Sequence, residues 1–425
     1  MANEIVVGRL KEDLEKFGTE ATAYLGKHIV GRGEEAHLTN KILMDLLRPH
    51  LVLICGKRGT GKSYFGGVIA EEITLLPEKH RKNLTVVMID TMGIYWSMKL
   101  PNEEQVTLLD EWGLKPIGLK DRVKVYVPFQ QKKDYEAAGI PVDYGISIPP
   151  YAFSAEEWST AFNLPATNPL AIGLQKAVNY IKNREERFGI DDLISTIKDD
   201  TSLDTHVKSS LESMLTVADS WGVFGDEGVK IDEVMKPGMI NVFDVSRLRS
   251  TEAWSVRNLL VALISKEIYY KRVLARKQEE LARIGEIKLK ERFPMVWLII
   301  DEAHNFVPSG FDTVSTAPLL TIVKQGREPG ISLVPMTQMP NKIHPEVVAQ
   351  ADMVISHRLT AKSDLEALHA TMQTYMMEDI WKYLQSLPKW RGSAIILDDN
   401  SERIYQMQTR PRLTWHAGES AIAVI

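Results

Sequence analysis

The sequence predicts an α/β fold, with a mainly parallel sheet interleaved with helices and a mostly helical insertion in the middle of the chain. Three observations support this prediction. Short apolar runs of strand length recur along the chain. A glycine-rich loop joins the first strong run, residues 51–55, to a segment of helical composition. From about residue 129 to residue 236, helical patterns replace the strand-like runs. Alternation of buried strands with helices is typical of a parallel sheet covered on both faces.

The composition is that of an ordinary globular protein. The chain has 425 residues, of which 44% are hydrophobic and 25% charged, and its formal net charge is −5. This charge argues against a small histone-like nucleic-acid binder, although a ring could still carry a basic inner face. Cys55 is the single cysteine, which excludes disulfides and a multi-cysteine zinc site and fits a reducing compartment.

Membrane segments and targeting signals are not expected. The longest strongly apolar run, residues 295–300, is too short to cross a bilayer. The N-terminus does not show a basic region followed by an apolar one, which a signal peptide would require. We therefore expect a cytoplasmic protein.

The expected elements divide the chain into four parts. Residues 1–50 are predicted to be a helical lead-in that packs on the core, with helical segments at residues 10–17 and 38–47. The core is predicted over residues 51–128 and 237–409, with strands at residues 51–55, 85–89, 123–127, 239–244, 295–300, 331–336, 353–357, 394–397 and 403–408.

The remaining parts are the insertion and the tail. The insertion, residues 129–236, should contain helices near residues 155–163, 170–187, 190–197 and 207–220. A long, charge-dense helix is expected from residue 251 to about residue 290. Residues 410–425 are expected to be a C-terminal tail that is either disordered or bound as an arm on a neighbouring molecule.

The glycine-rich loop fits the phosphate-binding pattern G-x-x-x-x-G-K-[ST] at every position. Its residues, with the first residue of the helix that follows, are predicted to hold a nucleotide: Gly56, Lys57, Arg58, Gly59, Thr60, Gly61, Lys62, Ser63 and Tyr64. The glycines allow the backbone to curl so that successive N–H groups point at one anion. Lys62 is expected to reach the β- and γ-phosphates, and the Ser63 hydroxyl to ligate Mg²⁺.

A second motif supplies acids. The buried run at residues 295–300 is followed directly by Asp301 and Glu302. Asp301 is expected to hold Mg²⁺ through water, and Glu302 to orient and activate the attacking water, because phosphoryl transfer depends on positioning and charge neutralisation. The two motifs together predict ATP hydrolysis.

Two further polar residues are candidates for catalysis. Gln338 follows the strand predicted at residues 331–336, where an amide could contact the γ-phosphate and report its loss. Arg327 lies in the loop before that strand, and an arginine inserted there from a neighbouring subunit could stabilise the transition state.

Several enzyme classes are excluded by missing motifs. The GTPase base-reading motif N-K-x-D and the metalloprotease motif H-E-x-x-H are both absent. Asp-Glu-Ala-His, at residues 301–304, also spells a helicase box. However, the 121 residues that follow it (425 − 304) are too few for the second motor domain that such helicases need.

At this point the chain resembles the HerA/FtsK superfamily of hexameric DNA-pumping ATPases, and most closely the archaeal HerA-like group. The likeness covers roughly residues 28–120 and 236–410. It depends on six motifs in order: the phosphate-binding loop and the segments at residues 89–95, 300–304, 326–331, 336–340 and 357–360.

The resemblance implies a RecA-like P-loop NTPase core that uses ATP and Mg²⁺, acts on double-stranded DNA and assembles as a hexamer. By the same likeness Arg327 matches the trans-acting arginine and Gln338 the sensor. Relatives carry a small β-barrel before the motor that docks a NurA-like nuclease, whereas residues 1–50 are expected to be shorter than this barrel and helical.

Three hypotheses about function follow. The first is an ATP-driven ring that translocates double-stranded DNA in repair or end processing. The second is a motor for secretion, conjugation or virion packaging. The third is a scaffold ATPase in a nuclease defence complex. Stimulation of ATP hydrolysis by DNA would favour the first hypothesis.

Overall fold

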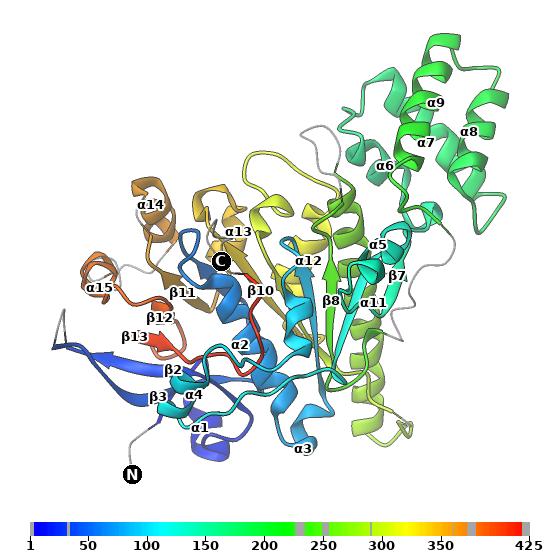
Figure 1. Cartoon of the computed structure of the whole chain (residues 1–425). Coiled ribbons are helices and arrows are strands. Elements are labelled where there is room, and N and C mark those ends of the chain that lie inside the picture. Colours follow the sequence, from blue (N-terminus) through cyan, green and yellow to red (C-terminus); the bar gives the residue numbers. More distant parts are fainter. Residues whose placement is uncertain are drawn as a thin grey trace.

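A computed structural model describes residues 4–31, 35–225, 234–248, 255–289, 291–359, 361–371 and 380–418. Their strands are β1 (Ile5–Val7), β2 (Thr22–Val30), β3 (His37–Asp45), β4 (Val52–Cys55), β5 (Leu84–Asp90), β6 (Val123–Pro128), β7 (Tyr144–Ile146), β8 (Ile240–Asp244), β9 (Met295–Ile300), β10 (Ile331–Thr337), β11 (Met353–His357), β12 (Ser393–Asp398) and β13 (Arg403–Thr409). They form one sheet in the order β1-β3-β2-β13-β12-β11-β4-β10-β9-β5-β8-β6-β7 (Figure 1).

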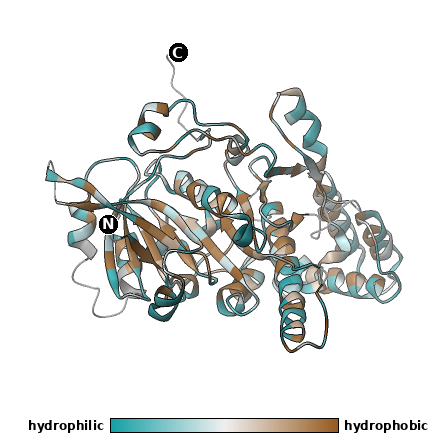
Figure 2. Ribbon diagram, turned by 90° about the horizontal axis from the view of Figure 1, so that it is seen from below, coloured by the Kyte–Doolittle hydropathy of each residue, from teal (hydrophilic) through white to brown (hydrophobic). Residues whose placement is uncertain are grey.

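The centre of this sheet is parallel, as predicted. All strands from β11 to β7 in that order run parallel to their neighbours, and β4 lies between β10 and β11. Alternate residues of these strands enter two hydrophobic cores: Leu53 joins one core, and Val52 and Ile54 join the other. Hydrophobic residues accordingly follow the strands in Figure 2. Both faces of the sheet are buried, which confirms the predicted α/β fold class.

The helices cover these two faces and form the insertion. They are α1 (Lys11–Phe17), α2 (Lys62–Leu75), α3 (Glu78–Arg81), α4 (Val106–Glu111), α5 (Lys132–Ala137), α6 (Ala155–Ala161), α7 (Pro169–Lys182), α8 (Ile190–Asp199), α9 (Thr205–Asp219), α11 (Val256–Arg283), α12 (Thr316–Gln325), α13 (Pro345–Ala349), α14 (Lys362–Thr371) and α15 (Ile380–Ser386). In the part of the chain that the structure describes, no helix is both long and apolar enough to cross a membrane.

The predicted insertion helices are present as α6 to α9, which project from the upper right of the sheet in Figure 1. Local sequence signals begin them. Ser154 and Glu157 form a reciprocal capping box at the start of α6, and the side chains of Asn168 and Asp204 cap α7 and α9. The strand β7 within this region was not predicted, and neither was the short helix α5.

The helix predicted at residues 38–47 is wrong. Residues 37–45 form β3, which pairs antiparallel with β2, and β2 pairs with β13. The apolar run that ends β3 is too short for its period to separate a helix from a strand, and the pairing with β2 selects the strand. The first fifty residues therefore extend the sheet, and the described residues among them form one helix, α1.

The expectation for the C-terminal tail is also wrong for the residues that can be described. Residues 410–414 are buried within the same chain, with the side chains of Arg410 and Arg412 fully enclosed. The reason is a buried acid, Glu71 on α2, which needs compensating cations.

Parts of several predicted segments lie outside the described residues. These are residues 1–3 and 32–34 of the lead-in, residues 249–250 and 372–379 of the core, Thr360 of the motif at 357–360, residues 226–233 of the insertion, residues 251–254 and 290 of the long helix, and residues 419–425 of the tail. The division of the chain into domains remains a prediction.

Candidate nucleotide site

The glycine-rich loop joins the buried strand β4 to α2, at the carboxyl edge of the sheet. Gly59 and Gly61 have φ values of 77° and 111°, in the left-handed region that favours glycine. Lys62 is the first residue of α2, so the loop and the unpaired N–H groups of the helix start face the same space. This local geometry suits a phosphate chain.

Lys62 is buried beside the two predicted acids. Its ammonium donates to the backbone oxygen of Lys57, at 3.4 Å. Burial lowers the pKa of Lys62, whereas the nearby carboxylates of Glu302 and Asp301 act in the opposite direction. The P-loop lysine and the acid pair, 239 residues apart in the chain, therefore meet at one place.

Ser63 and Asp301 are in direct contact. The Ser63 hydroxyl donates to Oδ2 of Asp301, at 3.3 Å. Asp301 is almost completely buried, and burial together with the charge of Glu302 raises its pKa to about 6. Hydroxyl and carboxylate oxygens are ligands that Mg²⁺ accepts, with phosphate and water completing its shell. The residues present therefore fit this ion.

Glu302 is held in an unusual backbone conformation. Its φ is +47°, which is rare for a residue other than glycine and is found at functional sites. Burial raises the pKa of Glu302, while the cation of Lys62 and the backbone N–H of Gln338 lower it. Among the described residues, Oε2 of Glu302 is buried without a hydrogen-bond partner. This oxygen is an acceptor available to a water molecule.

Gln338, which directly follows β10, joins this group. Its backbone N–H points at Glu302, and its side chain is half-buried. The residue before it, Thr337, contacts Nδ1 of His304 through its hydroxyl, at 3.0 Å. His304 thus links the end of β10 to the turn that carries Glu302.

Arg327 is not brought to this site within the chain. It lies in the loop between α12 and β10, at the amino edge of the sheet, whereas the P-loop lies at the carboxyl edge. Its guanidinium donates to Oδ2 of Asp352, at 3.0 Å, and its side chain is 69% exposed. The length of β10 separates Arg327 from Gln338 by roughly 20 Å.

Tyr64 turns its side chain toward the C-terminal segment. Its hydroxyl donates to Gln105 and accepts from the backbone N–H of Arg412, at 2.9 and 2.6 Å. Seven residues later on α2, the Glu71 carboxylate pairs with the guanidinium groups of Arg410 and Arg412. Sequence reasoning missed this support. The signal for it was Arg410-Pro411-Arg412, two cations in an otherwise weakly charged tail.

Asp90, at the end of β5, organises a second support. Its carboxylate accepts the backbone N–H groups of four successive residues, from Met92 to Tyr95. The turn places the Tyr95 hydroxyl 2.9 Å from the backbone oxygen of Ser63, to which it donates. Burial and the neighbouring Asp244 both raise the pKa of Asp90. The tie between this acid and the P-loop helix could be seen only in the structure.

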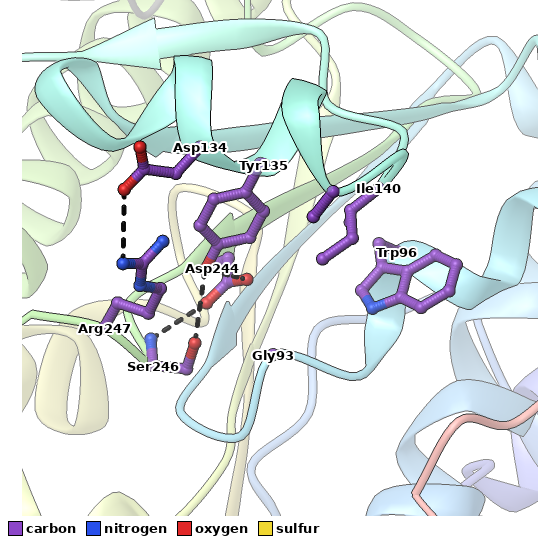
Figure 3. A pocket seen from close by; sticks show the side chains of 9 residues that line it. Gly93, Trp96, Asp134, Tyr135, Ile140, Asp244, Ser246 and Arg247 are labelled. Atoms are coloured by element: carbon purple, nitrogen blue, oxygen red, sulfur yellow. Dashed lines mark hydrogen bonds and ion pairs between the residues drawn. The ribbon is translucent and has the colours of Figure 1, made fainter.

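A separate cavity of about 230 Å³ lies beside this turn (Figure 3). It is lined by residues from three segments of the chain, among them Trp96, Tyr135, Asp244 and Arg247. Tyr135 donates to Asp244, and Arg247 pairs with Asp134. No residue of the predicted nucleotide site lines this cavity, so it is distinct from the P-loop site.

Comparisons with known proteins agree with this geometry. Residues 24–268 match the family model described as "Helicase HerA, central domain". The chain is 26% identical over 372 residues to a probable DNA double-strand break repair helicase HerA of Methanocaldococcus jannaschii, covering 80% of this chain and 67% of that protein. It is 21% identical over 388 residues to the DNA double-strand break repair helicase HerA of Sulfurisphaera tokodaii, covering 91% and 68%.

A solved structure supports the fold. VirB4 of Thermoanaerobacter pseudethanolicus superimposes with a TM-score of 0.54 at 14% identity, over 92% of this chain and 96% of that one. The family model covers more than half of the described chain's length, from β2 through the P-loop to α11. The resemblance stated from the motifs is thereby confirmed, and the chain belongs to the HerA helicase family of P-loop motor ATPases.

Proposed function

We propose that this protein is an ATP-hydrolysing ring motor that translocates double-stranded DNA. The observation that carries the proposal is the meeting of Lys62 and Ser63 with Asp301 and Glu302 at the carboxyl edge of the sheet. A P-loop lysine and hydroxyl that face two acids form an arrangement suited to a magnesium–ATP complex.

Each residue has a distinct part in hydrolysis. Lys62 and the loop N–H groups neutralise the β- and γ-phosphates, and Ser63 and Asp301 would hold Mg²⁺, which supplies charge neutralisation when bound. Glu302 accepts a proton from the attacking water. Burial raises the pKa of the Glu302 carboxyl toward neutral pH, and a general base is most effective when its pKa lies near the working pH. Gln338, whose backbone already contacts Glu302, senses the γ-phosphate.

Arg327 completes the site of a neighbouring copy. It lies too far from its own P-loop to contact bound ATP, yet it is exposed in an ordered loop. A ring of identical subunits, six by the family resemblance, would place it against the next nucleotide. Hydrolysis would then depend on assembly.

Double-stranded DNA as the substrate is supported by the two relatives described above, which are both named as DNA double-strand break repair helicases, one of them as probable. The chain spans about two thirds of the length of each, so the nuclease partner expected from the resemblance remains a proposal.

The test measures ATP hydrolysis with and without long linear duplex DNA, and displacement of a third strand from that duplex. We expect duplex to stimulate hydrolysis and ATP to drive displacement. Both effects should weaken steeply between about 50 and 200 mM salt, because contacts to phosphates release counterions. Lys62→Ala is the inactive control. ATP hydrolysis that duplex does not change, even at low salt, would contradict the DNA substrate and favour a motor for another cargo or a scaffold ATPase.

A further inference from the structure

The cavity drawn in Figure 3 has both aromatic and charged walls. Trp96 and Tyr135 contribute aromatic rings, Ala138 and Ile140 contribute aliphatic groups, and Asp244 contributes a carboxylate. The cavity volume of about 230 Å³ is several times the roughly 30 Å³ that one water molecule occupies in the liquid. The cavity therefore has room for a small organic molecule.

Asp244, the last residue of β8, is the charged group in the interior of this cavity. Its side chain is buried, and its two oxygens accept from neutral donors, the Tyr135 hydroxyl at 3.0 Å and the backbone N–H of Ser246 at 2.9 Å. A carboxylate can accept about four hydrogen bonds, so Asp244 has acceptor capacity left. In the part of the chain that the structure describes, no lysine or arginine forms an ion pair with it. Arg257, which interacts with its charge, donates instead to the backbone oxygens of Ser246 and Leu248.

The other two charges that line the cavity lie at its rim and neutralise each other. Arg247 and Asp134 form an ion pair at 3.3 Å, and their side chains are 51% and 64% exposed. The Arg247 guanidinium also lies 5.5 Å from the centre of the Tyr135 ring. In Figure 3, Arg247 is on one side of Tyr135, and Ile140 and Trp96 are on the other. A ligand in the cavity therefore meets the tyrosine ring from the side of Trp96.

These walls match an organic cation with a guanidinium group. A guanidinium donates two parallel hydrogen bonds to a carboxylate and stacks on aromatic rings, and an ammonium has neither property. A cation held over the face of a tryptophan or tyrosine ring is attracted by the ring electrons, most strongly where water is excluded. The aliphatic groups of Ala138 and Ile140 would cover a short carbon chain attached to the guanidinium.

The cavity shares a segment with the nucleotide site. Gly93 and Trp96, which both line the cavity, belong to the segment that follows β5. Gly93 has a φ of 68°, and a Cβ at this position would lie 3.1 Å from Oδ2 of Asp244, so the turn rests on the cavity carboxylate. Tyr95, in the same segment, donates to the backbone oxygen of Ser63 at 2.9 Å. A ligand that contacts Gly93 and Trp96 therefore restrains the segment that supports the P-loop helix.

We propose that this cavity binds a small organic cation through its guanidinium group, which lies on Asp244 between Trp96 and Tyr135, and that the bound cation increases the affinity for ATP. The binding is independent of the proposed function, whereas the effect on ATP rests on it. The direction of the effect follows from order. A segment that is already restrained loses less conformational freedom when a nucleotide binds beside it.

The first experiment measures binding of butylguanidinium to the full chain by ligand-observed NMR titration. N-butylurea has the same shape without the charge, and it should bind about tenfold more weakly or worse. Asp244→Asn keeps the size of the side chain, removes its charge, and should weaken butylguanidinium binding by a similar factor. Agmatine and a blocked arginine then distinguish a free amine from a protein side chain as the source of the group. Tighter binding of either one identifies that source.

The second experiment fills the cavity from its rim. Ala138 is exposed and lines the cavity, so Ala138→Trp should abolish butylguanidinium binding without disturbing the fold. The matched control is Ala137→Trp. Ala137 is the last residue of α5 and is also exposed, but it does not line the cavity, so this variant should bind normally. This pair tests the site even if Asp244→Asn fails to fold.

The third experiment measures the link to the nucleotide site. Saturating butylguanidinium should raise the affinity of the wild-type chain for a fluorescent ATP analogue by about fivefold. The same addition should have no effect on Ala138→Trp. Tyr95→Phe removes the hydrogen bond to Ser63, so this variant should bind butylguanidinium but lose its effect on the ATP analogue.

Equal binding of N-butylurea and butylguanidinium would overturn the recognition of a cation, and normal binding by Ala138→Trp would overturn the site. An ATP affinity that does not respond in the wild-type chain, or that responds fully in Tyr95→Phe, would overturn the link. A chain that binds the ATP analogue but not butylguanidinium would refute this inference alone. A chain that binds butylguanidinium but no ATP analogue would refute the proposed function and leave the cation site intact.

Discussion

The two edges of the central sheet both carry buried charges, but they differ in how completely those charges are paired. At the carboxyl edge, Lys62 has a backbone oxygen as its hydrogen-bond partner, and burial raises the pKa values of Asp301 and Glu302. A buried oxygen of Glu302 is also left without a hydrogen bond among the described residues. This edge is electrostatically incomplete.

At the amino edge one cluster of buried charges is closely paired. His50 is fully buried between Asp45 and Asp352, with contacts of 3.0 and 2.7 Å. Arg9 donates to Asp45 and Arg327 to Asp352. These partners outweigh burial, which opposes them, so the pKa of His50 rises to about 9 and those of both aspartates fall.

The difference indicates which edge is a binding site. A folded protein rarely leaves buried polar groups unsatisfied, so an incomplete cluster indicates a missing ligand, whereas a complete one indicates structure. The comparison predicts that substitutions at the carboxyl edge change activity with little effect on stability. Substitutions at the amino edge should do the reverse, except for the exposed Arg327.

The largest effect is expected for Glu302→Gln. Loss of the general base should lower kcat for ATP by about 10³-fold or more, ~4 kcal/mol or more, while ATP affinity stays within a few-fold. Steady-state hydrolysis and titration of a fluorescent ATP analogue measure the two quantities. Glu328→Gln, an exposed acid at the amino edge, is the control and should retain activity. A Glu302→Gln chain with normal turnover would remove Glu302 from the mechanism.

Asp352→Ala should show the opposite pattern. It leaves the His50 cation with one carboxylate and removes the acceptor for the backbone N–H of Leu51, so the free energy of unfolding should fall by about 3 kcal/mol. Urea unfolding measures this loss, with Glu328→Ala as the control. The folded variant should bind the ATP analogue normally. A stability change below about 1 kcal/mol would mean that the amino edge is not a structural cluster.

The pH dependence of stability should come from His50. Because its folded pKa of about 9 exceeds the ordinary value of 6.5, its contribution is complete below pH 6.5 and is lost as pH rises toward 9. The contribution should be about 3 kcal/mol. We expect the difference in unfolding free energy between the wild-type chain and His50→Asn to shrink from pH 6 to pH 9.5. A difference that stays constant over this range would show that His50 is neutral in the folded protein.

The smallest effect is expected for Arg48→Ala. Arg48 pairs with Asp13 near the same edge, but the arginine side chain is 57% exposed. Exposed pairs contribute about 0–1 kcal/mol because water screens them. Urea unfolding should therefore detect a loss below about 1 kcal/mol. A loss as large as that of Asp352→Ala would extend the structural cluster to the surface.

The position of the candidate nucleotide site was largely predictable because its signals are local. Gly59, Gly61 and Lys62 lie in one loop, and the acids directly follow a strongly apolar strand. The P-loop and the acid pair were expected at the same edge because parallel strands end together. The roles given to all of the site residues remain predictions, although the structure places Gln338 beside Glu302 and Arg327 beside Asp352.

The failures were at segments whose conformation depends on distant partners. The local pattern of residues 38–47 predicts a helix, but pairing with β2 makes residues 37–45 a strand. The tail looked unattached, since its partner, Glu71, is 339 residues from Arg410 in the chain. Neither contact leaves a periodic pattern in the sequence.

By itself the sequence determined the P-loop, the acids that directly follow a parallel strand, and the helical insertion. Backbone conformation and side-chain period act over a few residues, so these features can be recognised locally. Only the tertiary structure decided which charges are paired and which are not. It places His50 between two aspartates and pairs the buried C-terminal arginines with Glu71. It leaves Lys62 with only a backbone oxygen as hydrogen-bond partner, and one buried oxygen of Glu302 without a hydrogen bond among the described residues. Burial and pairing of charges are properties of the packed chain. Those two properties distinguish the carboxyl edge of the sheet, where the charges are incompletely paired, from the cluster around His50 at the amino edge.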